Sequence, residues 1–284
     1  MNLKSDLRIG FVGAGKVGTT LGAYFRSKGL NIAGYASRNP ESSQRAAKIT
    51  SSQSLTMNEL VADCDMLWIT TPDTQIKEVW KALNNCCLDG KIIIHCSGAM
   101  SSEVFQEIAE KNAFGYSIHP MFAFAHQNGD FDGLKSANFT VEGDPTRLEV
   151  IRQYFNILGN PVFIIDRQDK PNYHLANVMV TNLVLALIHL GTECLSQCSS
   201  FQEVALPALL PMIQNNLDNL KRSGFIDSLT GPVERNDLET IKKHLQCLAP
   251  LSETIYKELS KRLVTLSAQK HPEQNYAEIL HILS

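Results

Sequence analysis

The chain has 284 residues with 26 basic and 29 acidic side chains, which gives a formal net charge of −3. This near balance, without a long basic run, argues against a surface for nucleic acid or for an anionic membrane. Because 44% of the residues are hydrophobic, the chain can bury substantial cores, and its length predicts two domains.

The seven cysteines indicate a reducing compartment. Their number is odd, and the opening MNLKSDLRIG runs from charged residues directly into a strand, without the features of a signal peptide. We therefore expect reduced thiols and a cytoplasmic protein. Cys194 and Cys198 can share a helix face, but no second pair with metal-ligand spacing follows, so we predict no metal site.

The first part of the chain alternates strand-like runs with helix-length segments. Helices are predicted at Gly15–Lys28, Pro40–Ile49 and Thr74–Asn84. Turns bound the strand-like runs, which are rich in β-branched and aromatic residues. They are Leu7–Val12, Asn31–Ala36, Asp65–Thr71, Lys91–Ser97, Ala113–His119, Asn138–Gly143 and Pro161–Asp166. This alternation predicts a doubly wound, mostly parallel α/β sheet over residues 1–167.

A glycine-rich turn follows the first strand and opens the first helix. Its residues are Gly13, Ala14, Gly15, Lys16, Val17 and Gly18, in the pattern GxGxxG. The first glycine permits a tight turn, the second lets a pyrophosphate approach the backbone, and the third allows close helix packing. The helix then directs its positive end at the phosphates. We expect dinucleotide binding and a Rossmann fold for this domain.

The residues after the second strand indicate which dinucleotide binds. NAD-binding units place an acid there for the ribose hydroxyls, whereas this chain has Ser37 and Arg38. Arg38 can pair with a 2′-phosphate, and Ser37 can donate a hydrogen bond to it. We therefore predict NADP(H) as the cofactor. The alternative is that Arg38 is a solvated turn residue.

Two further strand ends are expected to border the cofactor, because ligands of open α/β sheets lie outside the carboxyl ends of the strands. Thr71 and Pro72 are predicted beside the ribose, and Ser97 and Gly98 nearer the nicotinamide. Cys96 is expected to be a buried thiol and not a nucleophile, because no base is evident beside it.

The second domain is predicted to be all-α and to cover residues 168–284. From Tyr173 onward the chain is helical in composition and period, with expected breaks at Leu206–Pro211 and Gly224–Asp237. The apolar stretch Leu175–Leu190 contains four polar residues and is shorter than a membrane span requires. It is therefore predicted to be a buried helix, and no membrane partner is expected.

Polar groups on this helix are candidates for catalysis. Successive residues of a helix are about 100° apart, so His174, Asn177 and Thr181 lie within a narrow arc of the helix surface. Asn182 widens this arc. His174 has a suitable pKa range to donate a proton, and Asn182 can orient a carbonyl. Alternatively, His174 and Asn182 bond only to the backbone of the neighbouring domain.

Three further polar residues are candidates for substrate contact. His119 ends a predicted strand directly before Pro120, and either contacts substrate or is structural. Arg235 can hold a substrate carboxylate with its planar guanidinium, and Asp237 can orient it. A surface Arg–Asp pair without a ligand is the alternative.

Several blocks together resemble Rossmann-like NADP-dependent oxidoreductases whose helical C-terminal domain was formerly of unknown function. These blocks are IGFVGAGKVGTTLG, ITTPD, HCSGAMSSEVF, SIHPMFAF, YHLANVMVTNLVLAL and LTGPVERND. The family is related to ketopantoate reductase, pyrroline-5-carboxylate reductase and 6-phosphogluconate dehydrogenase. The resemblance implies an NADP-binding domain, a helical domain that builds a homodimer, and a substrate cleft between the domains.

The resemblance departs from the better-known ketopantoate reductases at one position. Those enzymes carry a Lys four residues before an Asn on the first long helix of the second domain. Here Val178 stands four residues before Asn182, and Lys170 precedes Pro171, outside the expected helix. The resemblance therefore does not identify the proton donor.

These features predict an NADPH-dependent oxidoreductase that reduces a small 2-oxo acid to the 2-hydroxy acid. The resemblance implies ketopantoate, the precursor of pantoate in pantothenate biosynthesis, as the best single guess for the substrate. Two alternatives stay open: an imine reductase of the pyrroline-5-carboxylate type, and a non-catalytic NADPH-binding protein. The fold alone does not choose among them.

Overall fold

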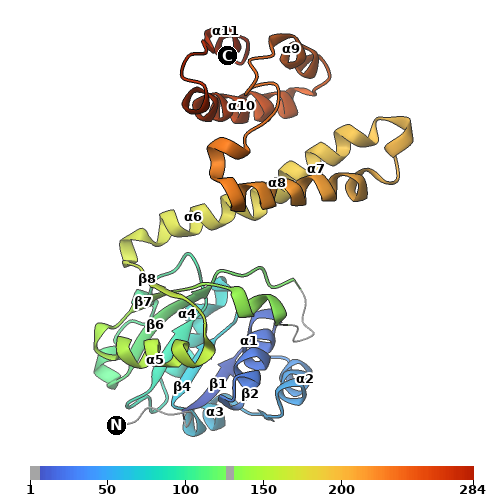
Figure 1. Cartoon of the computed structure of the whole chain (residues 1–284). Coiled ribbons are helices and arrows are strands. Elements are labelled where there is room, and N and C mark those ends of the chain that lie inside the picture. Colours follow the sequence, from blue (N-terminus) through green and yellow to red (C-terminus); the bar gives the residue numbers. More distant parts are fainter. Residues whose placement is uncertain (1–6, 126–130) are drawn as a thin grey trace. The chain divides into compact units, whose positions relative to one another are not determined.

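The computed structural model describes residues 7–125 and 131–284 of the chain. The chain divides into two compact units, Met1–Val180 and Thr181–Ser284. The first contains the sheet and the helix that follows it, and the second contains helices alone (Figure 1). The predicted order, an α/β domain followed by a helical region, is confirmed.

An eight-stranded sheet forms the centre of the first unit, in the order β3-β2-β1-β4-β5-β6-β7-β8. The β6–β7 pair is antiparallel, and the other described neighbours are parallel. The strands are β1 (Arg8–Val12), β2 (Asn31–Ala36), β3 (Gln53–Ser54), β4 (Met66–Ile69), β5 (Ile92–His95), β6 (Phe114–Pro120), β7 (Phe139–Gly143) and β8 (Val162–Ile164). The chain order reverses between β1 and β4, which is where a doubly wound sheet opens a crevice for its ligand.

Helices cover both faces of this sheet (Figure 1). They are α1 (Lys16–Ser27), α2 (Pro40–Thr50), α3 (Met57–Asp63), α4 (Asp73–Leu83) and α5 (Leu148–Leu158), and α6 (Lys170–Val180) follows the sheet without covering a face of it. One core joins apolar residues of α1, α2 and α5 to one face, and a second core joins α3 and α4 to the other. Short 3-10 turns are η1 (Ser102–Val104), η2 (Ile108–Lys111), η3 (Asp132–Ser136), η4 (Pro145–Arg147), η5 (Arg167–Asp169) and, in the second unit, η6 (Ser199–Phe201).

The expectation that Lys170 lies outside the helix is wrong. This residue begins α6, with Pro171 in the first turn, where the missing proline N–H costs no helical hydrogen bond. Lys170 is also 1% exposed, which makes it one of the largest fully buried side chains of the chain. Pro171 therefore marks the start of a helix that already includes Lys170, whereas the sequence analysis placed Lys170 before the helix.

The prediction of one buried helix over Leu175–Leu190 is also wrong. Two helices, α6 and α7 (Asn182–Ser196), meet at Thr181, which belongs to neither of them. None of the residues of α7 is buried within the chain. By length and composition alone, the helical stretch Arg167–Ser196 could cross a membrane.

The second unit is built from α7, α8 (Ala205–Ser228), α9 (Leu238–Gln246), α10 (Pro250–Lys270) and α11 (Ala277–Ile282). Helices α7 and α8 lie side by side, and a small core joins α9, α10 and α11 (Figure 1). The expected break at Leu206–Pro211 does not occur, because Pro207 lies in the first turn of α8 and Pro211 is accommodated inside it. The second expected break starts at Gly224, where a positive φ of 73° kinks the helix.

Candidate active site at the carboxyl ends of the strands

The sheet gathers the predicted cofactor residues at one edge. The glycine turn follows β1, Ser37 and Arg38 follow β2, Thr71 and Pro72 follow β4, and Ser97 follows β5. Because β2, β1, β4 and β5 are adjacent parallel strands, these segments all lie at the carboxyl edge beside the reversal of strand order. The topology thus brings together segments up to 84 residues apart, from Gly13 to Ser97.

The glycine turn has the geometry that a dinucleotide requires. Gly13 has a φ of +106°, which favours glycine, and a Cβ on Gly18 would stand 2.4 Å from the Gly13 carbonyl oxygen. A Cβ on Gly15 would meet nothing within 4 Å, so open space remains where a phosphate would approach. Helix α1 begins at Lys16 with no acidic residue in its first turn, which leaves the positive helix end available for an anion.

The residues around the turn also fit the rest of a dinucleotide. Ser37 is half-buried and Arg38 is exposed, directly before Asn39, which caps α2. The hydroxyl of Thr71 is buried and has no hydrogen-bond partner among the described residues. Buried polar atoms of this kind are normally satisfied, so a bound group is a natural partner for Thr71.

The hydroxyl of Ser97 shapes its own loop. It donates to Asp73 Oδ2 at 2.6 Å and accepts from the backbone N–H groups of Ala99 at 3.2 Å and Met100 at 3.0 Å. Buried His95 supports the same loop, since its Nδ1 accepts from Ser97 N–H and its Nε2 donates to Ser101 O. Burial lowers the pKa of His95 to about 4, so this imidazole is neutral and structural at pH 7.

A buried lysine lies at the centre of the polar groups beside this loop. Lys170 Nζ donates to Ser117 Oγ at 2.6 Å and to Ser97 O at 3.0 Å. Ser117 Oγ donates in turn to Ser97 O at 3.1 Å. Burial lowers the pKa of Lys170 to about 8, and the charges of Glu142 and Asp73 oppose that shift. The lysine therefore holds a proton near neutral pH and can release it.

Two histidines approach the same loop at Gly98. A Cβ on Gly98 would stand 3.0 Å from His174 Nδ1 and 3.1 Å from His119 Nε2, so a side chain at this position would crowd both rings. His119 Nδ1 is 2.6 Å from the hydroxyl of Tyr173, and burial lowers the pKa of His119 to about 4. His174 Nδ1 is buried and has no hydrogen-bond partner among the described residues.

Of the predicted catalytic residues, His119, His174 and Ser97 therefore lie together in the first unit. Sequence reasoning missed Lys170, Ser117, Tyr173, Asp73 and Glu142. The signal for Lys170 was its spacing: it stands four residues before His174, which places both side chains on one face of α6. Cys96 was expected to be buried and is only half-buried, but burial of its thiol raises the pKa well above the usual value, as expected of a thiol that is not a nucleophile.

The remaining predicted site residues belong to the second unit. Asn182 is exposed in the first turn of α7, where its Oδ1 accepts from the hydroxyl of Thr181 at 3.0 Å. Arg235 is exposed. Asp237 caps α9, because its carboxylate accepts from the backbone N–H of Thr240 at 3.1 Å and from its hydroxyl at 2.7 Å. These bonds are the main cause of its lowered pKa, and the Arg235 charge adds a smaller effect.

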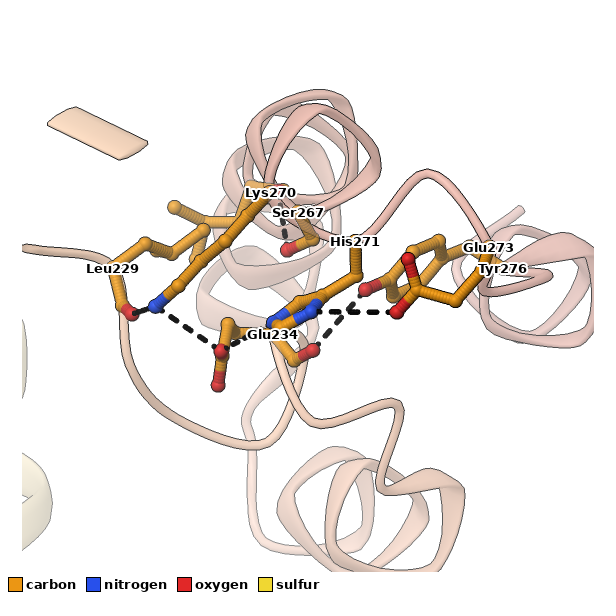
Figure 2. Close-up of polar contacts among 8 residues, drawn as sticks. Leu229, Glu234, Ser267, Lys270, His271, Glu273 and Tyr276 are labelled. Atoms are coloured by element: carbon orange, nitrogen blue, oxygen red, sulfur yellow. Dashed lines mark hydrogen bonds and ion pairs between the residues drawn. The ribbon is translucent and has the colours of Figure 1, made fainter. Parts of the chain in front are cut away.

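A polar cluster anchors the segment that carries Arg235 (Figure 2). Glu234 Oε1 lies 2.7 Å from His271 Nε2 and 3.2 Å from Lys270 Nζ, and the lysine also donates to Leu229 O at 2.8 Å. Tyr276 donates from its hydroxyl to Glu234 O at 3.1 Å. The His271 contact is the main reason why the pKa of Glu234 is lowered. The loop before α9 is thereby fixed to the end of α10, with the Arg235 side chain left exposed.

Comparison with known proteins divides the chain into two recognised parts. Residues 2–120 match a Rossmann-like domain, and residues 137–263 match DUF2520, a domain of unknown function. A search of the curated proteins gives no match.

Solved structures resemble the chain over nearly its whole length. A provisionally assigned NADP oxidoreductase from Bacteroides fragilis superposes with a TM-score of 0.74 and 22% identity, covering 92% of this chain and 99% of its own. A protein from Thermotoga maritima gives 0.69 and 26%, with 93% and 99% covered. An imine reductase from Pseudomonas sp. gives 0.60 and 16%, with 94% of each chain covered. The chain therefore shares its fold with these solved structures.

Proposed function

We propose that this chain, in which a Rossmann-like domain precedes a DUF2520 domain, is an NADPH-dependent reductase of a small 2-oxo acid. Ketopantoate is the first substrate to test. The glycine turn, Ser37, Arg38 and Thr71 would hold the cofactor, which supplies a hydride when bound. The chain's own contribution is to place the substrate, to deliver a proton and to exclude water.

One observation carries this proposal, namely the buried ammonium group of Lys170. An ammonium has three protons, and among the described residues Nζ donates to two acceptors, Ser97 O and Ser117 Oγ. Nζ also lies 6.0 Å from the centroid of the Tyr173 ring, and we assign its third proton to a ligand. Because its pKa is about 8, Lys170 can hold this proton at neutral pH and pass it to a developing alkoxide.

Two neighbouring histidines complement the lysine in this proposal. His174 Nδ1 lacks a partner among the described residues and would hydrogen-bond the substrate. His119, neutral at pH 7 because its pKa is about 4, would pack beside it without competing for the role of acid. Oxidation of NADPH, followed by absorbance with a panel of 2-oxo acids and cyclic imines, tests the assignment. Turnover of neither class would favour the non-catalytic reading.

An imine reductase is the second candidate, and the resemblance to the Pseudomonas imine reductase favours it. Reduction of a cyclic imine needs less help from a general acid, because an imine is readily protonated before the hydride arrives. Turnover of cyclic imines, with no turnover of 2-oxo acids, would select this candidate. The turnover of cyclic imines would then depend only weakly on Lys170.

We expect Arg38→Ala to reduce the preference for NADPH over NADH by roughly tenfold. The guanidinium would pair with the 2′-phosphate, and a charge-assisted hydrogen bond is worth about 1.5 kcal/mol or more. Titration of both cofactors by fluorescence measures this preference. Arg45→Ala, on the exposed side of α2, is the matched control and should change neither affinity. An unchanged preference in Arg38→Ala would return Arg38 to the class of solvated turn residues.

We also propose that the protein is a soluble cytoplasmic homodimer and that a second copy covers α7 and α8. The apolar side chains of these helices that are more than half exposed are Leu183, Leu185, Leu210, Met212, Leu217 and Phe225. Every copy carries the same surface, so a two-fold interface would cover it in both protomers. Lipid is a poorer cover, because α8 also carries Asp218, Lys221 and Arg222.

Leu185→Asp is expected to convert the dimer into monomers, because a charge would have to be buried in the apolar interface. Sedimentation equilibrium without detergent measures the state. Ile49→Asp, an exposed apolar position on α2, is the control and should remain dimeric. A monomeric wild type contradicts the proposal, and a wild type that requires detergent to stay in solution would point to lipid as the cover.

A further inference from the structure

A buried carboxylate lies on the same sheet face as the Lys170 contact and has no part in the function proposed above. In the antiparallel β6–β7 pair, Glu142 stands directly opposite Ser117, the residue whose hydroxyl accepts from Lys170 at 2.6 Å. Opposite residues of such a pair share a face, with Cβ atoms about 5 Å apart. Glu142 and the lysine ammonium are therefore near neighbours beside one serine.

The surroundings of Glu142 suit an ionised carboxylate. Its Oε2 accepts from the backbone N–H of Ser102 at 2.6 Å, and its Oε1 accepts from the hydroxyl of Ser102 at 2.7 Å. Both contacts are as short as charge-assisted hydrogen bonds. Glu142 is only 4% exposed, so little water screens its charge from a nearby cation.

The other titratable groups around Lys170 offset its positive charge less than Glu142 does. They are Asp73, His95, Cys96, His119, Tyr173 and His174. Burial disfavours the charged forms of His95, Cys96 and His119. Asp73 is exposed at the start of α4, where water screens its carboxylate. Glu142 is thus the buried anion that can balance the buried cation.

We infer that Glu142 is a positioning residue whose negative charge keeps Lys170 protonated at neutral pH. Two roles follow for one carboxylate: it holds the loop at Ser102, and it maintains the proton that the lysine would donate. The expected effect on kcat rests on the proposed function, whereas the expected effect on the protonation of Lys170 does not. Removing the charge should therefore make Lys170 lose its proton at lower pH.

The test uses the full chain with lysine labelled by ¹³C at Cε, so that NMR follows the titration of Lys170, identified by its absence in Lys170→Met. Glu142→Gln keeps the shape and can still bond to both groups of Ser102, but removes the charge. We expect its Lys170 midpoint to fall by about one pH unit. Ser102→Ala, which keeps the charge and loses one hydrogen bond, should leave the midpoint in place.

Three results would overturn the inference. They are an unchanged midpoint in Glu142→Gln, an equal fall in Ser102→Ala, and a larger fall in Asp73→Asn than in Glu142→Gln. If Glu142→Gln does not fold, Glu142→Thr, which suits a strand and lacks the charge, replaces it. The alkaline limb of the kcat profile should move with the NMR midpoint. A midpoint that moves without the kcat limb would contradict Lys170 as the acid, and would leave the role of Glu142 intact.

Discussion

Replacing Lys170 by Met should lower kcat by about 100-fold or more, the usual contribution of a positioned general acid. Methionine occupies a similar volume without the proton, so NADPH affinity should stay within about twofold. In the wild type, kcat should fall as pH rises through about 8, because the protonated lysine is the active form and its pKa is about 8. Stopped-flow turnover and a cofactor titration across this pH range measure both quantities.

Three further variants identify what Lys170 contributes. Lys170→Arg keeps the positive charge but does not release its proton, so its activity should stay low if proton transfer matters. Lys91→Met is the control, since Lys91 Nζ donates to Cys64 O at 2.7 Å near the start of β5, and its turnover should be normal. His174→Gln should lose roughly tenfold, as a lost substrate hydrogen bond would. A larger loss in His174→Gln than in Lys170→Met would make His174 the acid.

We propose, as the sequence predicts, that Arg235 pairs with the substrate carboxylate, so Arg235→Ala should raise the KM for a 2-oxo acid by about 10- to 100-fold, because a charge-assisted pairing is worth roughly 1.5 to 3 kcal/mol. Affinity for NADPH should barely change, since the proposed cofactor residues all lie in the first unit. Arg235→Lys should recover part of the loss, because an ammonium keeps the charge without the planar fork. Steady-state kinetics with varied substrate measure the effect.

The control for Arg235 is another exposed arginine of the same unit. Arg262→Ala, on α10, removes the same charge and should leave KM unchanged. Equal effects of the two variants would indicate a general effect of charge and not a specific contact. Normal substrate kinetics combined with weakened NADPH binding in Arg235→Ala would assign this arginine to the cofactor.

The periodicity of the sequence determined the first domain. Alternating apolar runs and helix-length segments, with a glycine turn after the first strand, depend on local geometry, and the structure confirms the mostly parallel sheet. The positions of Ser37, Arg38, Thr71 and Ser97 at one edge follow from the same argument, because parallel strands share a carboxyl edge.

Local rules failed where a residue's environment is set by distant parts of the chain. The proline rule gave the wrong place for Lys170, and only the tertiary structure puts its ammonium against Ser117, from a strand 53 residues earlier. The pairing of Glu142 with Ser117 likewise depends on the register of β6 and β7. The apolar composition of α7 predicted burial, but nothing in its period says whether the same chain supplies the cover.

Composition and period therefore determined the class of fold, the glycine turn and the edge at which a dinucleotide would bind. The tertiary structure alone decided which polar groups are withdrawn from water and which buried charges face each other. The physical reason is that strand and helix patterns arise from neighbouring residues, whereas the pKa of a group such as Lys170 depends on burial and on charges such as Glu142, which the fold brings near from distant segments.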